Sequence, residues 1–212
     1  MSHPALPRPA VFLDRDGVLN YNPEFYVKSW DEFRFLPGVL EALSALAACP
    51  WPIVVITNQS VVGRGIISAQ ALDEIHARMQ QAIAAAGGRL DGVYVCTHHP
   101  AQACTCRKPA PGLLLQAAAE LNLDLSASVF IGDSPGDVQA ALAAGVLPVL
   151  VRQNQEKPLA LEAPGMASGT AGSPGPLVGS DLPAVVDSLQ RVCALAKPPA
   201  DVIYYWPDWQ HF

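Results

Sequence analysis

Five short apolar segments recur along the chain, and longer segments with helical periodicity separate them. The short segments are rich in valine, isoleucine, leucine and phenylalanine, as strands covered on both faces should be. Strands that alternate with helices form parallel sheets joined by right-handed crossovers. The sequence therefore predicts a single α/β domain of Rossmann-like type, with a parallel sheet of about five strands flanked by helices. The predicted strands are residues 10–13, 53–57, 92–96, 128–132 and 147–151.

The clearest helical segment lies between the second and third predicted strands. Apolar residues recur there at steps of three and four from position 72 to position 86, which is the spacing of one helix face. Ser68 is available as the N-cap and Gly87 as the stop. His76 lies within this helix, where we expect it at the surface or at its boundary. The other predicted helices are residues 37–48, 111–121, 135–144 and 182–196.

The chain of 212 residues is short enough for one hydrophobic core, because single cores usually stop growing at about 250–300 residues. The main domain is expected over residues 1–196. Within it, residues 153–180 are rich in Pro, Gly, Ala and Ser and lack a period, so they predict an irregular loop. Residues 197–212 form a separate aromatic tail. The connections between the predicted strands are too short to hold a separate cap domain.

Charge and hydropathy disfavour several classes of partner. The net charge of −6 argues against broad electrostatic binding to nucleic acid or to an anionic membrane. No apolar run reaches the roughly 18–20 residues that span a bilayer, and the Pro-rich start has no signal-peptide segment. We therefore expect a cytoplasmic protein. Thiols stay reduced in that compartment, so the cysteines are interpreted as metal ligands or buried thiols rather than as disulfides.

Two carboxylates, Asp14 and Asp16, follow the first predicted strand, and Gly17 comes directly after them. Ligands of open α/β sheets bind at the carboxyl ends of strands. Two like charges this close cannot both ionise freely unless a cation compensates them. The pair is therefore suited to a nucleophile beside a general acid. Alone, the same pattern also fits solvated carboxylates in a turn.

Three other strand ends add complementary groups. Asp133 and Asp137 follow the fourth predicted strand, and carboxylates of this kind favour Mg²⁺. Thr57 begins a Thr-Asn-Gln-Ser run that supplies hydroxyl, amide and main-chain donors after the second strand. Lys108 follows the third strand after a short excursion and supplies a positive charge. The sheet is thus expected to bring two acids, donors, a cation and a metal site to one edge.

In this order, the motifs resemble those of haloacid-dehalogenase-like phosphatases. The resemblance implies that Asp14 attacks phosphorus to form an aspartyl-phosphate, and that Asp16 protonates the leaving oxygen and then activates the hydrolytic water. It also implies that Thr57 and Lys108 bind the phosphoryl oxygens. By the same likeness, Mg²⁺ is held by Asp14, Asp133 and the main-chain carbonyl of Asp16. The matching motifs are Asp14-x-Asp16-Gly17, Thr57-Asn58, Lys108-Pro109 and Gly132-Asp133-x-x-x-Asp137, with Val18 where the common pattern has threonine.

A phosphate-accepting, receiver-like module is the non-enzymatic alternative, because doubly wound domains with acidic pockets also take phosphate on aspartate. Asp16 distinguishes the two, since a general acid beside the nucleophile has no use in a passive acceptor. A phosphoryl transition state spreads charge over three oxygens, so its catalysis is mostly positioning and electrostatic stabilisation. The cation cluster expected at this edge therefore favours an enzyme, a phosphoric monoester hydrolase.

A second constellation follows the third predicted strand. A Cys-x-His pair and, five residues later, a Cys-x-Cys pair make a complete tetrahedral set for zinc. Four protein ligands leave no position open for water, so the zinc should be structural and should brace the loop that presents Arg107 and Lys108. Two alternatives remain: free cysteines around a turn, and His99 in place of the first histidine. The expected ligands are Cys96, His98, Cys104 and Cys106.

The zinc insert and the Gly63-Arg64-Gly65 loop narrow the resemblance to heptose-bisphosphate phosphatases, over about residues 11–152. Histidinol-phosphate phosphatase domains share the insert, and histidinol-phosphate hydrolysis is the alternative activity. Arg64 suits a second anionic group on the substrate, whereas histidinol phosphate carries cations. We therefore expect removal of the 7-phosphate of a heptose bisphosphate, in a route to nucleotide-activated heptose for surface polysaccharide.

The expected partner is this small sugar phosphate, with neither nucleic acid nor a membrane, and the chain is expected to be a monomer or a weak homodimer. Arg64 is a candidate contact on account of its charge, and the likeness implies the other contacts. The candidate substrate-binding residues are Asn22, Pro23, Glu24, Phe25, Asn58, Gln59, Ser60, Arg64, Arg107 and Ser134.

Overall fold

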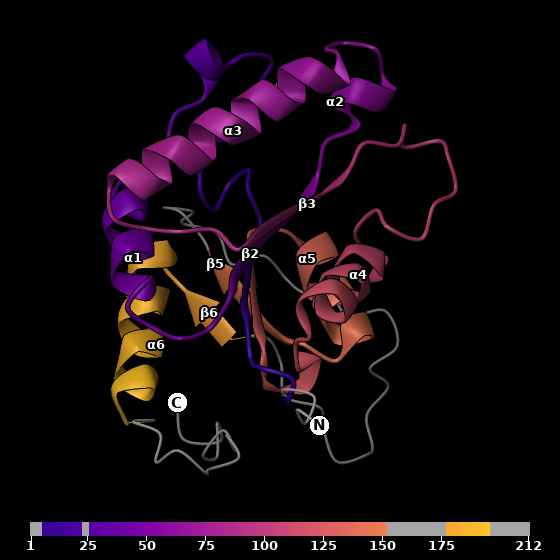
Figure 1. Cartoon of the computed structure of the whole chain (residues 1–212). Helices are drawn as coiled ribbons and strands as arrows, with labels where there is room; N and C mark the ends of the chain where they lie inside the picture. Colours follow the sequence, from indigo (N-terminus) through magenta and orange to yellow (C-terminus); the bar gives the residue numbers. More distant parts are fainter. Residues whose placement is uncertain (1–5, 23–25, 152–176, 196–212) are drawn as a thin grey trace, which may run out of the picture.

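The computed structural model describes residues 6–22, 26–151 and 177–195. Its centre is a parallel sheet with the strand order β3-β2-β1-β4-β5-β6 (Figure 1). All five predicted strands are present, and each boundary lies within one residue of its predicted position. These strands are β1 (Val11–Leu13), β2 (Ile53–Asn58), β3 (Gly92–Cys96), β4 (Val129–Gly132) and β5 (Leu147–Val151).

A sixth strand corrects the prediction for the end of the Pro- and Gly-rich segment. β6 (Leu177–Gly179) pairs in parallel with β5 at the edge of the sheet, so the expectation of irregular structure is wrong for these three residues. Only Leu177 and Val178 are apolar in this strand, and the residues around them are Gly, Pro and Ser, so the sequence shows no continuous apolar segment of the kind that marks the other strands. Residues 153–176 of the predicted loop and the tail at 197–212 lie outside the described residues.

All five predicted helices are present. Ser68 is the N-cap of the long helix α3, because its side chain accepts a hydrogen bond from the Ala71 N–H. Gly87 follows the helix with a positive φ of +87°, as expected for a stop. The sequence did not predict α2 (Ser60–Gly63) or the 3₁₀ turns η1 (Trp30–Glu32) and η2 (Leu125–Ala127). The predicted helices are α1 (Val39–Leu46), α3 (Ala69–Ala85), α4 (Gly112–Leu121), α5 (Pro135–Ala144) and α6 (Leu182–Leu195).

Helices cover the sheet on both faces, with α1, α3 and α6 on one side and α4 and α5 on the other (Figure 1). Alternate residues of a strand point to opposite faces. In β1, Val11 and Leu13 therefore join the core under α1, α3 and α6, whereas Phe12 joins the core under α4 and α5. All three side chains are fully buried, which is the reason for the uniformly apolar strand segments in the sequence.

Two expectations about single residues need correction. Cys49 is buried, as expected, but it is disulfide-bonded, so the interpretation of this residue as a free thiol is wrong. His76 is buried rather than at the surface, with 6% of its area exposed.

Among the described helices, none has the length and apolar character needed to cross a bilayer.

Candidate active site

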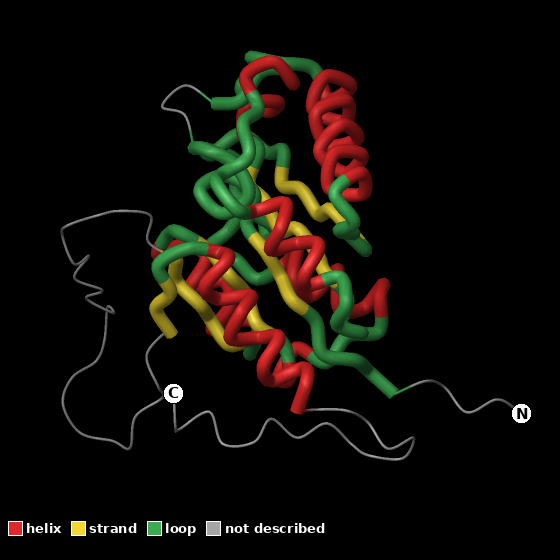
Figure 2. The backbone as a smooth tube through the Cα atoms, turned by 90° about the vertical axis from the view of Figure 1, so that its left-hand side faces the viewer, coloured by secondary structure: helices red, strands yellow, loops and turns green. Residues whose placement is uncertain are grey.

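The chemistry-bearing residues lie where the central strands end. β1 lies between β2 and β4, and the order of the strands reverses beside it, which is the position where open α/β sheets bind ligands. Asp14 directly follows β1, Thr57 is near the end of β2 and Asp133 follows β4. Lys108 comes from the loop after β3. Loops gather at one end of the strands, as Figure 2 shows.

Asp14 is held by a main-chain donor and by a lysine. Its Oδ1 accepts a hydrogen bond from the Arg15 N–H at 2.7 Å and lies 2.8 Å from Lys108 Nζ. Burial raises the pKa of Asp14 to about 8, and the charge of Asp137 adds to this rise, while Lys108 opposes it. Asp14 therefore needs positive charge in addition to that of Lys108 to be fully ionised and nucleophilic at neutral pH.

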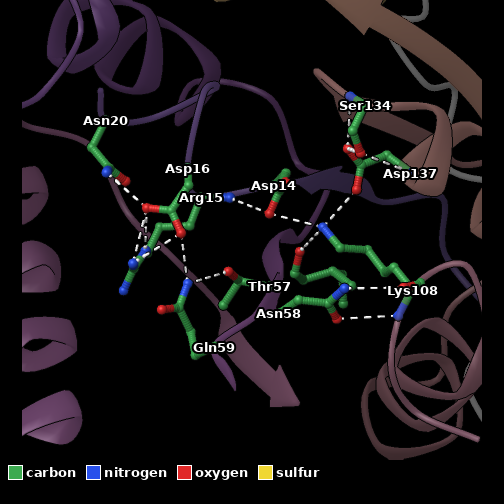
Figure 3. A network of polar contacts seen from close by, with 11 residues as sticks. Asp14, Arg15, Asp16, Asn20, Thr57, Asn58, Gln59, Lys108, Ser134 and Asp137 are labelled. Carbon is green, nitrogen blue, oxygen red and sulfur yellow. Dashed lines mark hydrogen bonds and ion pairs between the residues drawn. The ribbon is translucent and has the colours of Figure 1, made fainter. Parts of the chain in front are cut away.

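Lys108 lies between two carboxylates. Its Nζ is 2.8 Å from Asp14 Oδ1 and 2.6 Å from Asp137 Oδ1, and it donates to the Ile56 carbonyl at 2.9 Å (Figure 3). Burial alone would lower the pKa of Lys108, but the charges of the two carboxylates outweigh it, so the pKa is raised. Asn58 holds the backbone of Lys108 through two 3.1 Å hydrogen bonds, one in each direction. The lysine is thus a permanent, fixed positive charge.

Asp16 has a different set of partners. Arg15 makes a bidentate contact with the carboxylate of Asp16, through Nε at 3.2 Å and Nη2 at 2.9 Å. Asn20 Nδ2 donates to Oδ1 at 2.9 Å, and Gln59 Nε2 donates to Oδ2 at 2.7 Å. In Figure 3 the carboxylate of Asp16 is turned toward this group of donors, whereas Asp14 faces Lys108. The side chains of the two acids therefore have different hydrogen-bonding partners.

The site contains a carboxylate cluster that fits Mg²⁺. Oxygen atoms of Asp14, Asp133 and Asp137 lie within 4.8 Å of one another. Asp137 is already engaged, with Oδ1 on Lys108 and Oδ2 accepting from the N–H and Oγ of Ser134. Asp14 and Asp133 remain as the side chains suited to a hard cation that completes its shell with waters and phosphate oxygens. Burial raises the pKa of Asp133 to about 6, so a cation there would also stabilise its ionised form.

Gly17 makes room for the carboxylate of Asp133. Its φ is +83°, and a Cβ at this position would lie 1.8 Å from Asp133 Oδ2. Glycine is therefore needed here both for backbone conformation and for space.

We expect Gly17→Ala to displace Asp133 and to weaken Mg²⁺ binding at least about tenfold, since metal sites require ligands held in place. Titration of activity with Mg²⁺ measures this. Gly65→Ala is the control, because its φ is +70° but a Cβ there has no neighbour within 4 Å. An unchanged Mg²⁺ requirement in Gly17→Ala would contradict the assignment.

Thr57, Gln59 and Ser60 are buried at the end of β2 and the start of α2. The Gln59 Nε2 group donates to Thr57 Oγ1 at 2.9 Å as well as to Asp16. Gln59 thus links the expected phosphate-binding threonine to the second acid. Val18, which replaces the more common threonine, is a buried member of the core under α1, α3 and α6.

The cysteine cluster forms beside this edge. Cys96 Sγ lies 3.8 Å from Cys104 Sγ, and His98 Nδ1 lies 3.5 Å from Cys96 Sγ and 3.2 Å from Cys106 Sγ. These four side chains could hold one metal ion. His99 is not part of this cluster, and its Nδ1 accepts a hydrogen bond from the Ala101 N–H. The structure therefore selects His98 from the two histidines that the sequence left open.

The remaining candidate contacts are scattered around the site. Asn22 and Arg64 are exposed. Arg107 is partly buried, and its Nη1 is a buried donor with no hydrogen-bond partner among the described residues. The side chain of Ser134 is occupied, since it forms a capping box with Asp137 at the start of α5. Residues 23–25, which the sequence analysis also assigned to the substrate, lie outside the described residues.

Sequence reasoning missed three residues of this network. Arg15 and Asn20 bind Asp16, and His76 contacts Arg15 through its Nε2, 3.1 Å from Arg15 Nη1. Arg15 and Asn20 were visible within the first motif, but nothing in the sequence showed that they share a partner. His76 is 61 positions away from Arg15, and only the packing of α3 brings the two together.

A doubly wound sheet with two acids, a lysine and a carboxylate cluster at its switch point defines a phosphatase of the haloacid-dehalogenase-like class. The comparisons agree: a family model described as HAD-hydrolase-like matches residues 105–174. A D-glycero-β-D-manno-heptose-1,7-bisphosphate 7-phosphatase from Bordetella bronchiseptica is 41% identical over 84% of this chain and 96% of its own length. The enzyme of that name from Escherichia coli K12 is 39% identical over 86% and 96%.

A solved structure also shows similarity to a heptose-bisphosphate phosphatase. The D,D-heptose 1,7-bisphosphate phosphatase from B. bronchiseptica, crystallised with magnesium and phosphate, has a TM-score of 0.76 and 38% sequence identity, and the match covers 87% of this chain and 99% of that one. The chain belongs to the D-glycero-β-D-manno-heptose-1,7-bisphosphate 7-phosphatase family.

Proposed function

We propose that this chain hydrolyses the 7-phosphate of D-glycero-D-manno-heptose 1,7-bisphosphate in the presence of Mg²⁺. The observation that carries the reaction class is the convergence of Asp14, Lys108 and Asp133 at one end of the sheet. Membership of the family and the names of its relatives support the substrate.

In the proposed reaction, a carboxylate oxygen of Asp14 forms a bond to phosphorus while the bond from phosphorus to the sugar oxygen breaks. Asp16 gives its proton to that oxygen, which leaves as a sugar hydroxyl. A water molecule then attacks phosphorus, Asp16 takes back a proton, and inorganic phosphate leaves with Asp14 restored. Thr57 and Lys108 bind the phosphoryl oxygens.

Asp14, Asp133 and the main-chain carbonyl of Asp16 would hold Mg²⁺. When bound, this cation neutralises charge on the phosphoryl group. The raised pKa values of Asp14 and Asp133 support a site that depends on added positive charge. The buried Nη1 of Arg107, which has no hydrogen-bond partner among the described residues, supports a role for this side chain as a donor to the substrate.

A substrate panel tests the assignment. Both anomers of the heptose bisphosphate and histidinol phosphate should be compared by kcat/KM under identical Mg²⁺. We expect the better anomer to exceed histidinol phosphate by about 100-fold or more, since a site built for a second anion rejects a substrate that lacks it. A preference for histidinol phosphate would overturn the substrate assignment and leave the reaction class intact.

We further propose that Cys96, His98, Cys104 and Cys106 bind one structural zinc ion. The support is their mutual approach and a donor set that satisfies tetrahedral zinc without an open position. Lys108 follows Cys106 by two residues, so an ordered zinc loop would fix the start of the segment that carries the lysine.

The zinc proposal predicts about one zinc per chain by metal analysis, and loss of that zinc in Cys104→Ser. We expect this variant to melt about 4–8 °C lower, as a loss of ~2 kcal/mol would produce in a domain of this size. His99→Ala is the matched control, because the neighbouring histidine lies outside the cluster. Equal zinc content in the two variants would rule out the ligand set.

A further inference from the structure

Arg15 is a charged side chain with no access to solvent. It is 0% exposed, and a guanidinium group stays protonated in proteins and can only donate hydrogen bonds. Its Nε and Nη2 donate to Asp16, and its planar group lies 6.0 Å from the centre of the Phe33 ring. Its Nη1 has a partner on a different element, His76 of α3.

The contact with His76 determines where the imidazole carries its proton. Arg15 Nη1 is the donor, so His76 Nε2 must be the acceptor and the neutral ring must carry its proton on Nδ1. Burial lowers the pKa of His76 to about 4, and the neighbouring charge of Arg15 adds to this effect. His76 is therefore a neutral acceptor at physiological pH.

We infer that His76 is a positioning residue for the general acid, because it anchors the arginine that holds Asp16. The inference rests on the proposed phosphatase function, in which Asp16 moves the proton. His76 does not touch the substrate, and its action passes through Arg15. Helix α3 thereby contributes to a site whose two acids, threonine and lysine come from the ends of strands and from their loops.

The hydrogen bonds around Asp16 explain why an anchor matters. Both of its carboxylate oxygens are occupied by donors from Arg15, Asn20 and Gln59. Asp16 must turn from these donors to deliver a proton to a leaving oxygen, and it must return to a defined position for the next cycle. Without His76, the Nη1 of Arg15 would be a buried donor without an acceptor, which is costly. The guanidinium would then shift toward another acceptor and displace Asp16.

The test compares two esters that differ in their need for an acid. A sugar phosphate has a poor leaving group that requires protonation, whereas p-nitrophenolate leaves without it. The kcat/KM of both reports the step that forms the aspartyl-phosphate. We expect His76→Ala to lower kcat/KM for the heptose bisphosphate at least about tenfold, part of the 10²–10⁴-fold contribution of a general acid. For p-nitrophenyl phosphate the change should be less than about threefold.

Two further variants separate positioning from folding. His76→Gln supplies an amide oxygen as acceptor and should recover most of the activity toward the sugar phosphate. Arg78→Ala, at an exposed position of the same helix, should leave both esters unaffected. Equal losses for the two esters in His76→Ala, or no recovery in a folded His76→Gln, would overturn the inference. Failure of the unmodified chain to hydrolyse either ester would instead defeat the proposed function itself.

A measurement on the unmodified protein covers the case in which His76→Ala does not fold. The ¹⁵N chemical shifts of the His76 ring distinguish the two neutral tautomers. A proton on Nδ1 with Nε2 as acceptor supports the contact with Arg15. A proton on Nε2 would exclude that contact and with it the role of His76.

Discussion

Asp14→Asn is expected to abolish hydrolysis of every phosphate ester by this chain, with Mg²⁺ present. An amide has no nucleophilic carboxylate oxygen, and a nucleophile cannot be replaced by its neighbours, so the loss in kcat should be on the order of 10⁴-fold or more. Release of inorganic phosphate at saturating substrate measures it. Mass spectrometry of the variant after incubation excludes deamidation back to aspartate.

The control for this variant is Asp73→Asn, which makes the same change at an exposed position of α3 and should keep full activity. The alternative of a passive phosphate acceptor makes a different prediction, because it would show no turnover even in the unmodified chain. Measurable turnover by pure Asp14→Asn would show that Asp14 is not the nucleophile.

The same residue has an expected effect on stability. The pKa of Asp14 is raised from 3.8 to about 8 in the fold, so the folded state keeps a proton that the unfolded chain releases between these values. The free energy of unfolding in the absence of Mg²⁺ should therefore fall as the pH rises from about 4 to about 8. Asp14→Asn should weaken this dependence, and Mg²⁺ should offset it in the unmodified protein. Thermal melts across the pH range with and without Mg²⁺ measure both effects.

The strands and long helices could be predicted because their signals are local. Buried parallel strands require continuous apolar segments, and α3 has a complete amphipathic pattern with a serine N-cap. β6 could not be predicted in this way, because its two apolar residues lie in a Pro- and Gly-rich segment and its place in the sheet is defined by its pairing with β5. The disulfide of Cys49 was missed for another reason. Reduced thiols were inferred from the expected compartment, and that inference takes no account of which cysteines lie close together in the fold.

The convergence of the candidate reacting groups could also be predicted, because motif order and the parallel sheet together place them at one edge. The contacts that hold those groups could not be predicted. Asn58 is a predicted substrate contact, and the structure adds that its side chain holds the backbone of Lys108. Gln59 links Thr57 to Asp16. Such roles depend on distances between side chains from separate loops, and no spacing in the sequence reports those distances.

Lys108→Met is expected to damage both stability and catalysis. The side chain of Lys108 is 4% exposed and is the shared partner of Asp14 and Asp137. Its removal leaves two buried carboxylates uncompensated, and breaking a buried pair in this way costs about 3–5 kcal/mol. In the proposed mechanism it also removes a positive charge from the phosphoryl oxygens, for which we expect a further loss in kcat of roughly 10²–10³-fold, the effect of removing one electrostatic donor. Denaturant unfolding and steady-state kinetics measure the two effects separately.

A double variant separates the two roles of the lysine. Adding Asp137→Asn to Lys108→Met removes one of the two uncompensated charges, while the amide oxygen can still accept the hydrogen bonds from Ser134 that cap α5. We expect the double variant to recover much of the lost stability, because the effects of substitutions at contacting residues are not additive. We do not expect it to recover the lost activity. Lys28→Met, at an exposed position, is the control. Recovery of activity together with stability would mean that Lys108 acts only by neutralising Asp137, and that the phosphoryl oxygens have another partner.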